Sequence, residues 1–437
     1  TGTDRTNERP VGPPLHDRAR RLARTARILG HMPERARYVT HLEAAIDGAV
    51  LPAETVQTTH EGRPLWVRYD LEAVRGAVDR DALEARPADM WRYLELSPLA
   101  EPDARVSLGE TATPLLQAPR LAAELGLRNL LIKDESRLPT GSFKARGMAM
   151  AVSRARELGV ERVAVPTAGN AGGALAAYAA RAGMDAWVFM PADTPAVNRY
   201  EAALSGARTY LVEGLINDCG AIVRDGVGAM GWFDMSTLRE PYRIEGKKTM
   251  GLELADQLGW RLPAVILYPT GGGTGLIGMW KAFAELEAVG WLDTPDKPRM
   301  IACQSDGCAP IATAYAAGER FAEPAADPHT IAAGIRVPVA VGDFMILDAV
   351  RESDGAALTA EEGRLAGWMH LADALEGIAL CPEAAACVGV LEGMVREGSI
   401  DPDEQVVIFN TGAAQKYVEA IGNDLPVVEP PIDYAAL

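Results

Sequence analysis

The chain has 437 residues, of which 48% are hydrophobic and 24% are charged, so its composition is that of a globular protein with a substantial core. Sixty Asp and Glu residues outnumber 43 Lys and Arg residues, and the formal charge of −17 disfavours nucleic acid or an anionic membrane surface as a partner. Five cysteines without closely spaced pairs disfavour a disulfide framework and predict a reducing cytoplasm. No apolar run reaches the roughly 18 residues of a membrane-spanning helix.

Residues 1–105 are predicted to form an N-terminal extension. Its first part, residues 1–37, is rich in Arg and Pro and lacks the apolar stretch of a signal peptide. We interpret it as a solvated arm or one that wraps a neighbouring subunit, with an organellar presequence as the alternative. Farther on, Pro64–Tyr69 reads as a strand, and a helix is predicted near Asp70–Val78.

From Ser107 onward, short apolar strands alternate with Ala-rich helical stretches, which predicts an α/β fold with a mostly parallel sheet. In such sheets, ligands bind beyond the carboxyl ends of the strands, so the turns that follow the strands are candidate sites. The predicted strands are Asn129–Lys133, Arg162–Pro166, Ala186–Met190, Thr209–Val212, Ala264–Pro269, Met300–Gln304 and Gln405–Phe409.

A glycine-rich turn follows the strand that ends at Pro269 and precedes a predicted helix from Leu276 to Glu287. Because side chains are nearly absent, its backbone N–H groups can approach an anion, and the helix N-terminus favours negative charge. The predicted phosphate-binding residues are Gly271, Gly272, Gly273, Thr274 and Gly275. The run Gly273–Gly278 also matches G-x-G-x-x-G, so a dinucleotide site is an alternative. Its acidic residue would be expected about 20 positions on, and Asp306 comes later, which favours a single phosphate.

Three further turns carry polar groups suited to a cofactor. Lys144 follows a Thr-Gly-Ser turn at a predicted helix start, where burial and the helix N-terminus lower the pKa of its amine, so it can form a Schiff base unless it is simply solvated. The turn Thr167–Gly173 offers donors for a carboxylate, and the Asn170 amide can bond a phenolic oxygen or cap the helix. The hydroxyl of Thr411 is a candidate ligand contact, and the alternative is that it caps the nearby backbone. Together these groups predict pyridoxal phosphate holding an amino acid.

The same motifs, in this order, resemble the fold-type II pyridoxal-phosphate enzymes and, more narrowly, the threonine synthases. The resemblance covers residues 107–422 and is carried by Ser107–Leu115, Gly141–Gly147, Ala168–Gly172, Pro241–Thr249, Gly271–Gly275, Cys381–Ala385 and Asn410–Gly412. It implies a fold like that of the tryptophan synthase β subunit, in which two open, twisted α/β domains enclose the active site. The implied large domain comprises residues 106–150 and 246–437, and the small mobile domain comprises residues 151–245. A homodimer is also implied.

The resemblance further implies roles for individual residues. Lys144 would be the catalytic residue and carry the cofactor, Asn170 would bond the cofactor's phenolic oxygen, and Thr411 would meet its pyridine nitrogen. The turn Gly271–Gly275 would hold its phosphate. The implied substrate-binding residues are Ser142, Thr167, Ala168, Gly169, Ala171, Ser236, Glu240, Arg243 and Lys247.

Two departures from the family pattern concern this substrate region. Glu240 stands where relatives usually have Asn, and Lys247 stands where Gln is common, so we expect Arg239 or Lys247 to neutralise the added acid. Relatives also often carry Cys pairs in an N-terminal module, where this chain has none. His41 and His60 do not replace them, so no metal is predicted.

The leading functional interpretation is a threonine-synthase-like lyase that eliminates phosphate from O-phosphohomoserine and adds water to give threonine. The runner-up is β-elimination or β-replacement on a serine, phosphoserine or threonine-like substrate, including a step in specialised metabolism. A partner-binding pseudoenzyme and a nicotinamide dehydrogenase are the alternatives from other classes.

Overall fold

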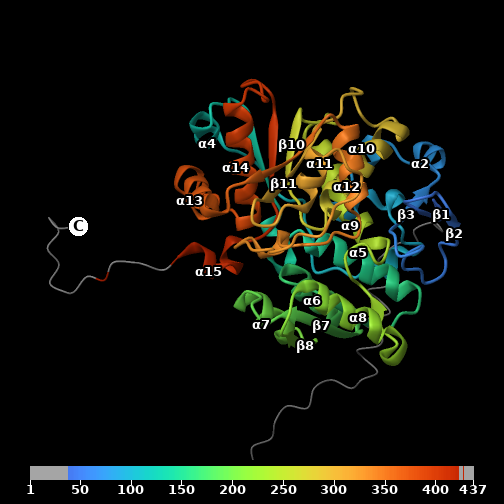
Figure 1. The fold of residues 1–437 in the computed structure, drawn as a ribbon. Coiled ribbons are helices and arrows are strands. Elements are labelled where there is room, and N and C mark those ends of the chain that lie inside the picture. The colour runs from blue at the N-terminus through green and yellow to red at the C-terminus, as the bar shows by residue number, and fades with distance from the viewer. Residues whose placement is uncertain (1–37, 423–426, 428–437) are drawn as a thin grey trace, which may run out of the picture. The chain divides into compact units, whose positions relative to one another are not determined.

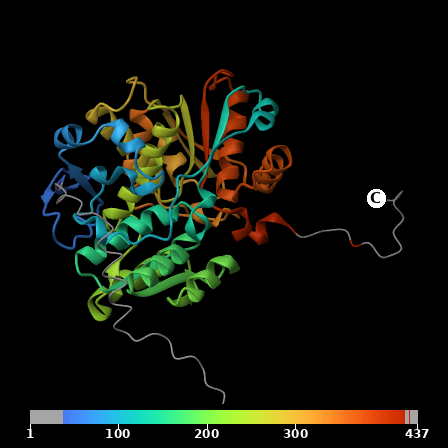
Figure 2. The ribbon, with the colours of Figure 1, turned by 180° about the vertical axis from the view of Figure 1, so that it is seen from behind.

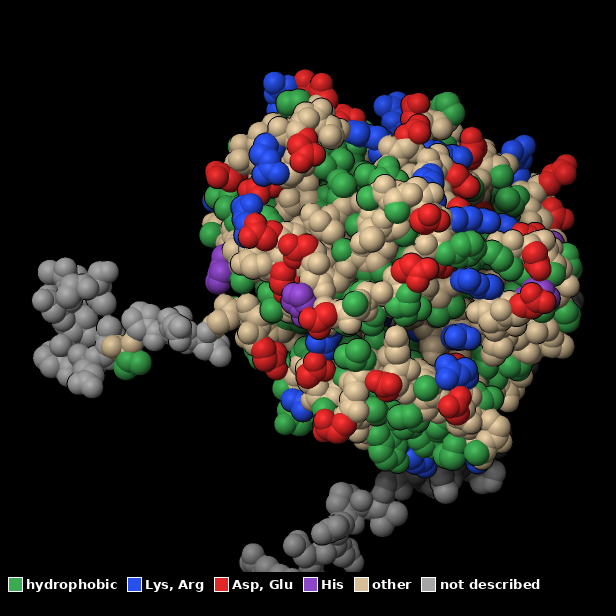
Figure 3. Space-filling model, in the orientation of Figure 1, with side chains coloured by type: hydrophobic (Ala, Val, Ile, Leu, Met, Phe, Trp, Pro, Cys, Tyr) green, Lys and Arg blue, Asp and Glu red, His purple; other side chains and the backbone are tan. Residues whose placement is uncertain are grey.

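The computed structural model describes residues 38–422 and residue 427. The chain divides into the units Thr1–Arg37 and Tyr38–Leu437, and the described residues all belong to the second unit. The predicted arm at residues 1–37 therefore lies outside the described residues. Within the part that is described, no helix combines the length and the apolar character needed to cross a membrane. On the face drawn in Figure 3, acidic and basic side chains are interspersed, and no large basic patch is seen.

A small antiparallel sheet begins the described chain. Its strands are β1 (Val39–Ala44), β2 (Val50–Leu51) and β3 (Leu65–Tyr69), in the order β2-β1-β3. The strand predicted at Pro64–Tyr69 is thus confirmed. Two helices follow, α2 (Leu71–Ala77) and α3 (Arg80–Glu84). The carboxylate of Asp70 accepts a hydrogen bond of 2.9 Å from the Ala73 amide, which caps α2 where a helix was predicted.

A six-stranded sheet forms the centre of the larger part of the fold. Its order is β12-β11-β10-β13-β5-β4, and it is parallel except for β4. The strands are β4 (Leu115–Gln117), β5 (Leu130–Asp134), β10 (Val265–Pro269), β11 (Arg299–Ser305), β12 (Ala356–Ala360) and β13 (Val406–Asn410). Every residue of β5, β10 and β13 is buried, which explains why apolar residues predominate in them.

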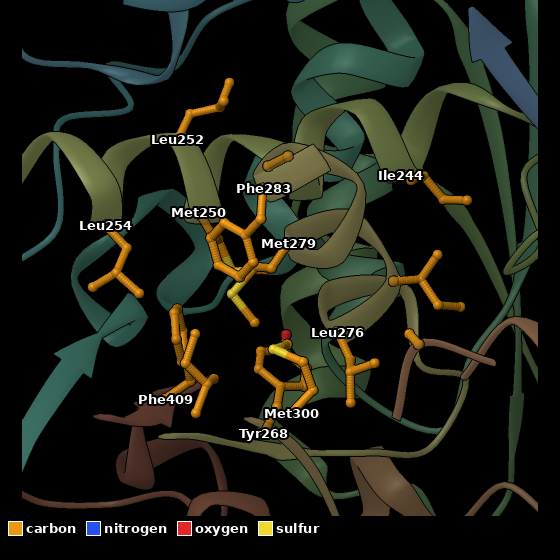
Figure 4. Packing of buried hydrophobic residues seen from close by; sticks show 14 of the residues in the cluster. Ile244, Met250, Leu252, Leu254, Tyr268, Leu276, Met279, Phe283, Met300 and Phe409 are labelled. Carbon is orange, nitrogen blue, oxygen red and sulfur yellow. The ribbon is translucent and has the colours of Figure 1, made fainter. Parts of the chain in front are cut away.

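Helices cover both faces of this sheet. One face packs against α4 (Pro119–Glu124), α13 (Leu365–Glu376) and α14 (Pro382–Arg396); the other packs against α9 (Tyr242–Gln257), α10 (Thr274–Val289), α11 (Pro310–Ala316) and α12 (Asp343–Glu352). Figure 4 shows Met250 of α9 and Phe283 of α10 lying side by side above Tyr268 of β10. Figures 1 and 2 both place the β1–β3 sheet on the side away from α13 and α14.

A second, four-stranded sheet is parallel throughout, in the order β8-β7-β6-β9. Its strands are β6 (Arg162–Pro166), β7 (Asp185–Pro191), β8 (Arg208–Val212) and β9 (Phe233–Asp234). The helices of this region are α5 (Lys144–Glu157), α6 (Asn170–Ala182), α7 (Ala196–Leu204) and α8 (Ile216–Met230), and Figure 1 shows α6, α7 and α8 around the sheet.

The remaining helical segments are short. They are the helix α15 (Val418–Ile421) and the 3-10 helices Met90–Leu96, Pro102–Ala104, Glu135–Arg137, Pro139–Gly141, Ala333–Ile335, Glu362–Arg364 and Ala414–Lys416. All seven strands predicted after Ser107 are present within one or two residues of their expected ends. The α/β fold with mostly parallel sheets is therefore confirmed, while the proposed domain boundaries stay a prediction.

Candidate active site

A cavity of about 350 Å³ lies beyond the carboxyl ends of β6, β10 and β13, where the predicted turns meet. The predicted residues on its lining are Lys144, Thr167, Ala168, Gly169, Asn170, Ala171, Ser236, Gly271, Gly272, Gly273, Thr274, Gly275 and Thr411. The predicted residues outside its lining are Ser142, Glu240, Arg243 and Lys247. The structure thus brings four sequence-distant turns to one site.

Lys144 is the first residue of α5 and lies on the cavity lining. The turn before it includes Thr140, whose φ of 60° lies in a region that residues other than glycine rarely adopt. Burial, reinforced by the positive charge of Arg243, lowers the pKa of Lys144 to about 7. An amine that is largely neutral near pH 7 is suited to Schiff-base formation.

The turn that carries Lys144 is bonded directly to the turn that carries Thr411. The amide of Phe143 donates a hydrogen bond of 3.0 Å to the carbonyl oxygen of Thr411, and Ser142 pairs with Gly412 in an isolated bridge. The Thr411 hydroxyl lies 3.6 Å from the sulfur of Cys381. The predicted lysine and hydroxyl therefore share one backbone framework.

The glycine turn leads into α10 and is bare of large side chains. Gly273 precedes the helix at φ 72°, and a Cβ placed there would lie 2.3 Å from the Ile346 side chain. A Cβ at Gly272 would lie 2.8 Å from Cγ2 of Thr237. These contacts exclude larger residues, so backbone N–H groups at the helix N-terminus remain the principal donors for an anion.

Asn170 begins α6 and lies on the cavity lining. Its Nδ2 atom donates a hydrogen bond of 2.8 Å to the hydroxyl of Tyr417, and its Oδ1 atom is buried without a partner among the described residues. The second hydrogen on Nδ2 can be donated to a phenolic oxygen of a ligand, and Oδ1 can accept from a ligand's donor group. Beside it, the hydroxyl of Thr167 accepts a hydrogen bond of 3.0 Å from the amide of Gly169, which holds the turn in shape.

Glu240 and Arg243 lie at the start of α9. The Glu240 carboxylate accepts hydrogen bonds from the backbone amides of Tyr242 at 2.7 Å and Arg243 at 3.0 Å, and burial raises its pKa to about 7. The Arg243 guanidinium donates to the carbonyl oxygen of Met235 at 2.7 Å. The positive charge of Arg243 acts on Glu240, a cation that differs from both Arg239 and Lys247, the two neutralising partners expected from the sequence.

Several lining residues escaped the sequence prediction. They are Asn217, Arg224, Thr237, Glu383, Arg336 and Tyr417, together with Arg239, which had been considered only as a neutralising charge. Glu383 stands within a motif that carried the family resemblance, so a signal for it existed. Arg336 follows an irregular stretch without a periodic pattern, and no local feature of the sequence marks it.

One cluster of potential metal ligands occurs among the described residues, outside this cavity. The carboxylates of Asp47 and Glu61 and a ring nitrogen of His60 lie within 4.8 Å of one another. His60 lies 3.5 Å from Asp47 as an ion pair, so the two side chains partner each other when His60 is protonated. The prediction that the protein holds no metal stays a prediction.

Comparison with known proteins defines the class of the site. The family described as "Pyridoxal-phosphate dependent enzyme" matches residues 106–412, which span the cavity-lining turns, and the chain belongs to this family. The threonine synthase of Methanocaldococcus jannaschii is 35% identical over 368 residues, covering 84% of this chain and 90% of that protein. The threonine synthase of Methanosarcina acetivorans is 36% identical over 349 residues, covering 79% and 84%. Within the class, the protein is a pyridoxal-phosphate-dependent lyase of the threonine synthase family.

Solved structures confirm the fold-type II architecture. Threonine deaminase isoform 2 from Solanum lycopersicum has a TM-score of 0.60 at 20% identity and covers 78% of this chain and 89% of its own. Diaminopropionate ammonia lyase from Escherichia coli has a TM-score of 0.60 at 19% identity and covers 72% and 88%. The cofactor is pyridoxal phosphate. The buried Asn170 amide, whose Oδ1 atom has no partner among the described residues, and the bare glycine turn fit it. This result argues against the dehydrogenase alternative.

Proposed function

We propose that the protein converts O-phosphohomoserine to threonine by eliminating phosphate and adding water. The observation that carries this proposal is a single cavity lined by Lys144, the glycine turn, the turn Thr167–Ala171 and a group of arginines. The threonine synthases at 35% and 36% identity support the same reaction class.

When bound, pyridoxal phosphate withdraws electrons from an attached amino acid and so makes the C–H bonds of that amino acid easier to deprotonate. Lys144 would carry the cofactor, the amides of Gly271–Gly275 would hold its phosphate, and Asn170 would bond its phenolic oxygen. Thr411 would face its pyridine nitrogen with a neutral hydroxyl, which favours elimination and replacement chemistry. The Lys144 amine takes up and returns protons at the substrate carbons, for which its pKa of about 7 is well suited.

The turn Thr167–Ala171 would orient the substrate carboxylate with backbone donors at the start of α6. For the leaving group, the cavity offers the hydroxyls of Ser236 and Thr237 and the guanidinium groups of three arginines. Arg224 and Arg336 already pair with acidic side chains, at 3.2 Å and 2.9 Å respectively.

Arg239 differs from the other two arginines because it forms no ion pair within the described residues. A guanidinium free to pair is suited to bidentate contact with a phosphate ester. We assign Arg239 as the main cation for the substrate phosphate.

Phosphate release from O-phosphohomoserine, measured beside serine, phosphoserine and threonine, tests the proposed reaction. We expect kcat/KM to be highest for O-phosphohomoserine, and Arg239→Gln to lower it by about tenfold or more for this substrate. A smaller effect is expected on serine, which has no phosphate. No phosphate release from O-phosphohomoserine, together with turnover of serine or phosphoserine, would replace this proposal with β-elimination.

We also propose that residues 151–245 act as a mobile domain which closes over the cavity and excludes water. This segment holds the four-stranded sheet, Thr167–Ala171 and Arg239, so its closure would bring the carboxylate- and phosphate-binding groups toward Lys144. The homodimer, the cytoplasmic location and the lack of nucleic acid or membrane partners remain proposals, based on the family resemblance and the acidic composition.

A further inference from the structure

Glu383 is a buried carboxylate on the cavity lining, and none of the roles considered so far involves it. It lies in the first turn of α14 with only 3% of its surface exposed. Its Oε1 atom accepts a hydrogen bond of 2.7 Å from the amide of Gly334. Its Oε2 atom is buried and has no partner among the described residues. Burying a carboxylate oxygen without a donor is costly, so this atom is suited to receive one from a group in the cavity.

The Oε1 atom of Glu383 holds residues 333–337 in place, and these residues form one wall of the predicted cofactor site. Gly334 belongs to the 3-10 helix Ala333–Ile335, and this segment packs on the glycine turn. A Cβ at Gly271 would lie 2.8 Å from Cγ2 of Val337 and 3.0 Å from Cα of Ile335. By holding Gly334, Glu383 therefore also holds the neighbouring residues against which the predicted phosphate-binding turn packs.

The negative charge of Glu383 acts on Lys144 of α5, on Cys381 at the start of α14, and on Lys416 and Tyr417 of the C-terminal segment. Arg243 and Lys247 of α9 are positively charged groups that interact with Lys144. The negative charge of Glu383 raises the pKa of Lys144, whereas burial and Arg243 lower it. Asp234, the other carboxylate on the lining, already accepts hydrogen bonds from the amide and hydroxyl of Ser236.

We propose that Glu383 is a positioning residue with two separable roles: one oxygen holds the 333–337 wall against the glycine turn, and the other is the anionic partner of the nitrogen that Lys144 presents to the cavity. The proposal depends on the pyridoxal-phosphate site and not on the identity of the substrate. Its failure is therefore distinguishable from failure of the proposed reaction.

The holoenzyme allows both roles to be tested without measuring turnover. Glu383→Gln keeps an oxygen for the Gly334 amide but removes the charge, so the protonated nitrogen at Lys144 loses its partner. We expect the pH midpoint of the bound cofactor's visible absorption to move to lower pH by about one unit or more. Glu383→Ala removes both roles, and we expect the same shift plus a roughly tenfold rise in the cofactor's dissociation constant.

Glu362→Gln is the matched control. Glu362 accepts a hydrogen bond of 2.7 Å from the Ile331 amide, just before the same wall, but lies outside the cavity lining. We expect an unchanged midpoint in this variant, with circular dichroism verifying that all variants are folded. An unchanged midpoint in Glu383→Gln, or an equal shift in Glu362→Gln, overturns the role of the charge. Equal cofactor affinity of Glu383→Gln and Glu383→Ala overturns the anchoring role.

Discussion

The side-chain nitrogen of Lys247 donates a hydrogen bond of 2.5 Å to the carbonyl oxygen of Phe143, the residue that precedes Lys144. The same nitrogen lies 4.1 Å from the centroid of the Phe143 ring, and the nitrogen of Lys144 lies 4.2 Å from it. A lysine that was expected to act on the substrate thus connects α9 to the start of α5. Its effect on catalysis would pass through the position of Lys144.

Lys247 should make stability depend on pH. Burial lowers the pKa of Lys247 in the folded protein well below its ordinary value. At a pH between the folded-state pKa and the unfolded-state pKa, the unfolded chain therefore binds more protons than the native state. The free energy of unfolding should therefore rise with pH up to about 10, by roughly 1.4 kcal/mol per pH unit for this group. Lys247→Met should reduce that slope in urea unfolding from pH 7 to 10. Lys297→Met, at a more exposed lysine paired with Glu287, should not.

Glu240 should have the opposite dependence. Its pKa is raised to about 7 in the folded state from an ordinary value of 4.5, so native stability contributed by this group is lost as pH rises through 7. Glu240→Gln keeps an acceptor for the Tyr242 and Arg243 amides without the charge. We expect it to match the parent protein at pH 4 and to be more stable at pH 8 by up to about 3 kcal/mol. Equal stabilities at pH 8, measured by denaturant unfolding, would contradict this expectation.

Lys144 should be the residue that bonds the cofactor. Lys144→Ala should abolish both turnover and the visible absorption of the bound cofactor, because no other lysine lies on the described cavity lining. Borohydride reduction of the parent enzyme followed by peptide mapping should place the label on Lys144. Label on another lysine, such as Lys247, would show that the assignment is wrong.

The glycine turn should bind the cofactor's phosphate through its backbone. Gly272→Asp introduces a Cβ that would lie 2.8 Å from Thr237 and places a negative charge beside the expected dianion. We expect a loss of cofactor affinity of about 100-fold or more in equilibrium dialysis. Gly363→Asp, at an exposed glycine with open space around it, should retain affinity. Normal affinity in Gly272→Asp would contradict the backbone site.

Thr411 should act through a neutral hydroxyl. Thr411→Ser keeps that hydroxyl and should retain turnover within about a few-fold, whereas Thr411→Asp should stabilise a protonated pyridine nitrogen and reduce or divert the reaction. Product analysis by chromatography and the absorption maximum of the bound cofactor measure the two effects. An Asp variant with unchanged rate and products would contradict this role.

The strands and the turns of the site were predictable because their signals are local. The parallel strands β5, β6 and β13 each contain a run of at least three apolar residues, and Asn170 and Thr411 lie in the turns just after β6 and β13. Lys144 follows β5 after two short 3-10 helices. Short strands such as β9, with two residues, carry too little periodicity to be recognised.

The orientation of individual side chains was not predictable in the same way. Lys247 and Glu240 belong to a motif that suggested substrate contact, yet one bonds the Phe143 carbonyl and the other caps α9. The Lys247 contact depends on how α9 packs against α5, which no local pattern encodes, whereas the Glu240 contact is a local cap that the family motif did not suggest. The alignment of Glu383 with Gly334 likewise depends on a loop without periodic sequence.

The bridge between Ser142 and Gly412 joins segments that lie far apart in the sequence. Because strand β13, which leads to Gly412, is synthesised long after the turn that carries Lys144, that turn remains without its backbone partner until β13 has emerged. A ribosome-bound chain that lacks β13 should therefore be unable to retain pyridoxal phosphate. Loading of the cofactor is thereby delayed until β13 has been synthesised, which couples acquisition of the reactive aldehyde to the presence of both segments.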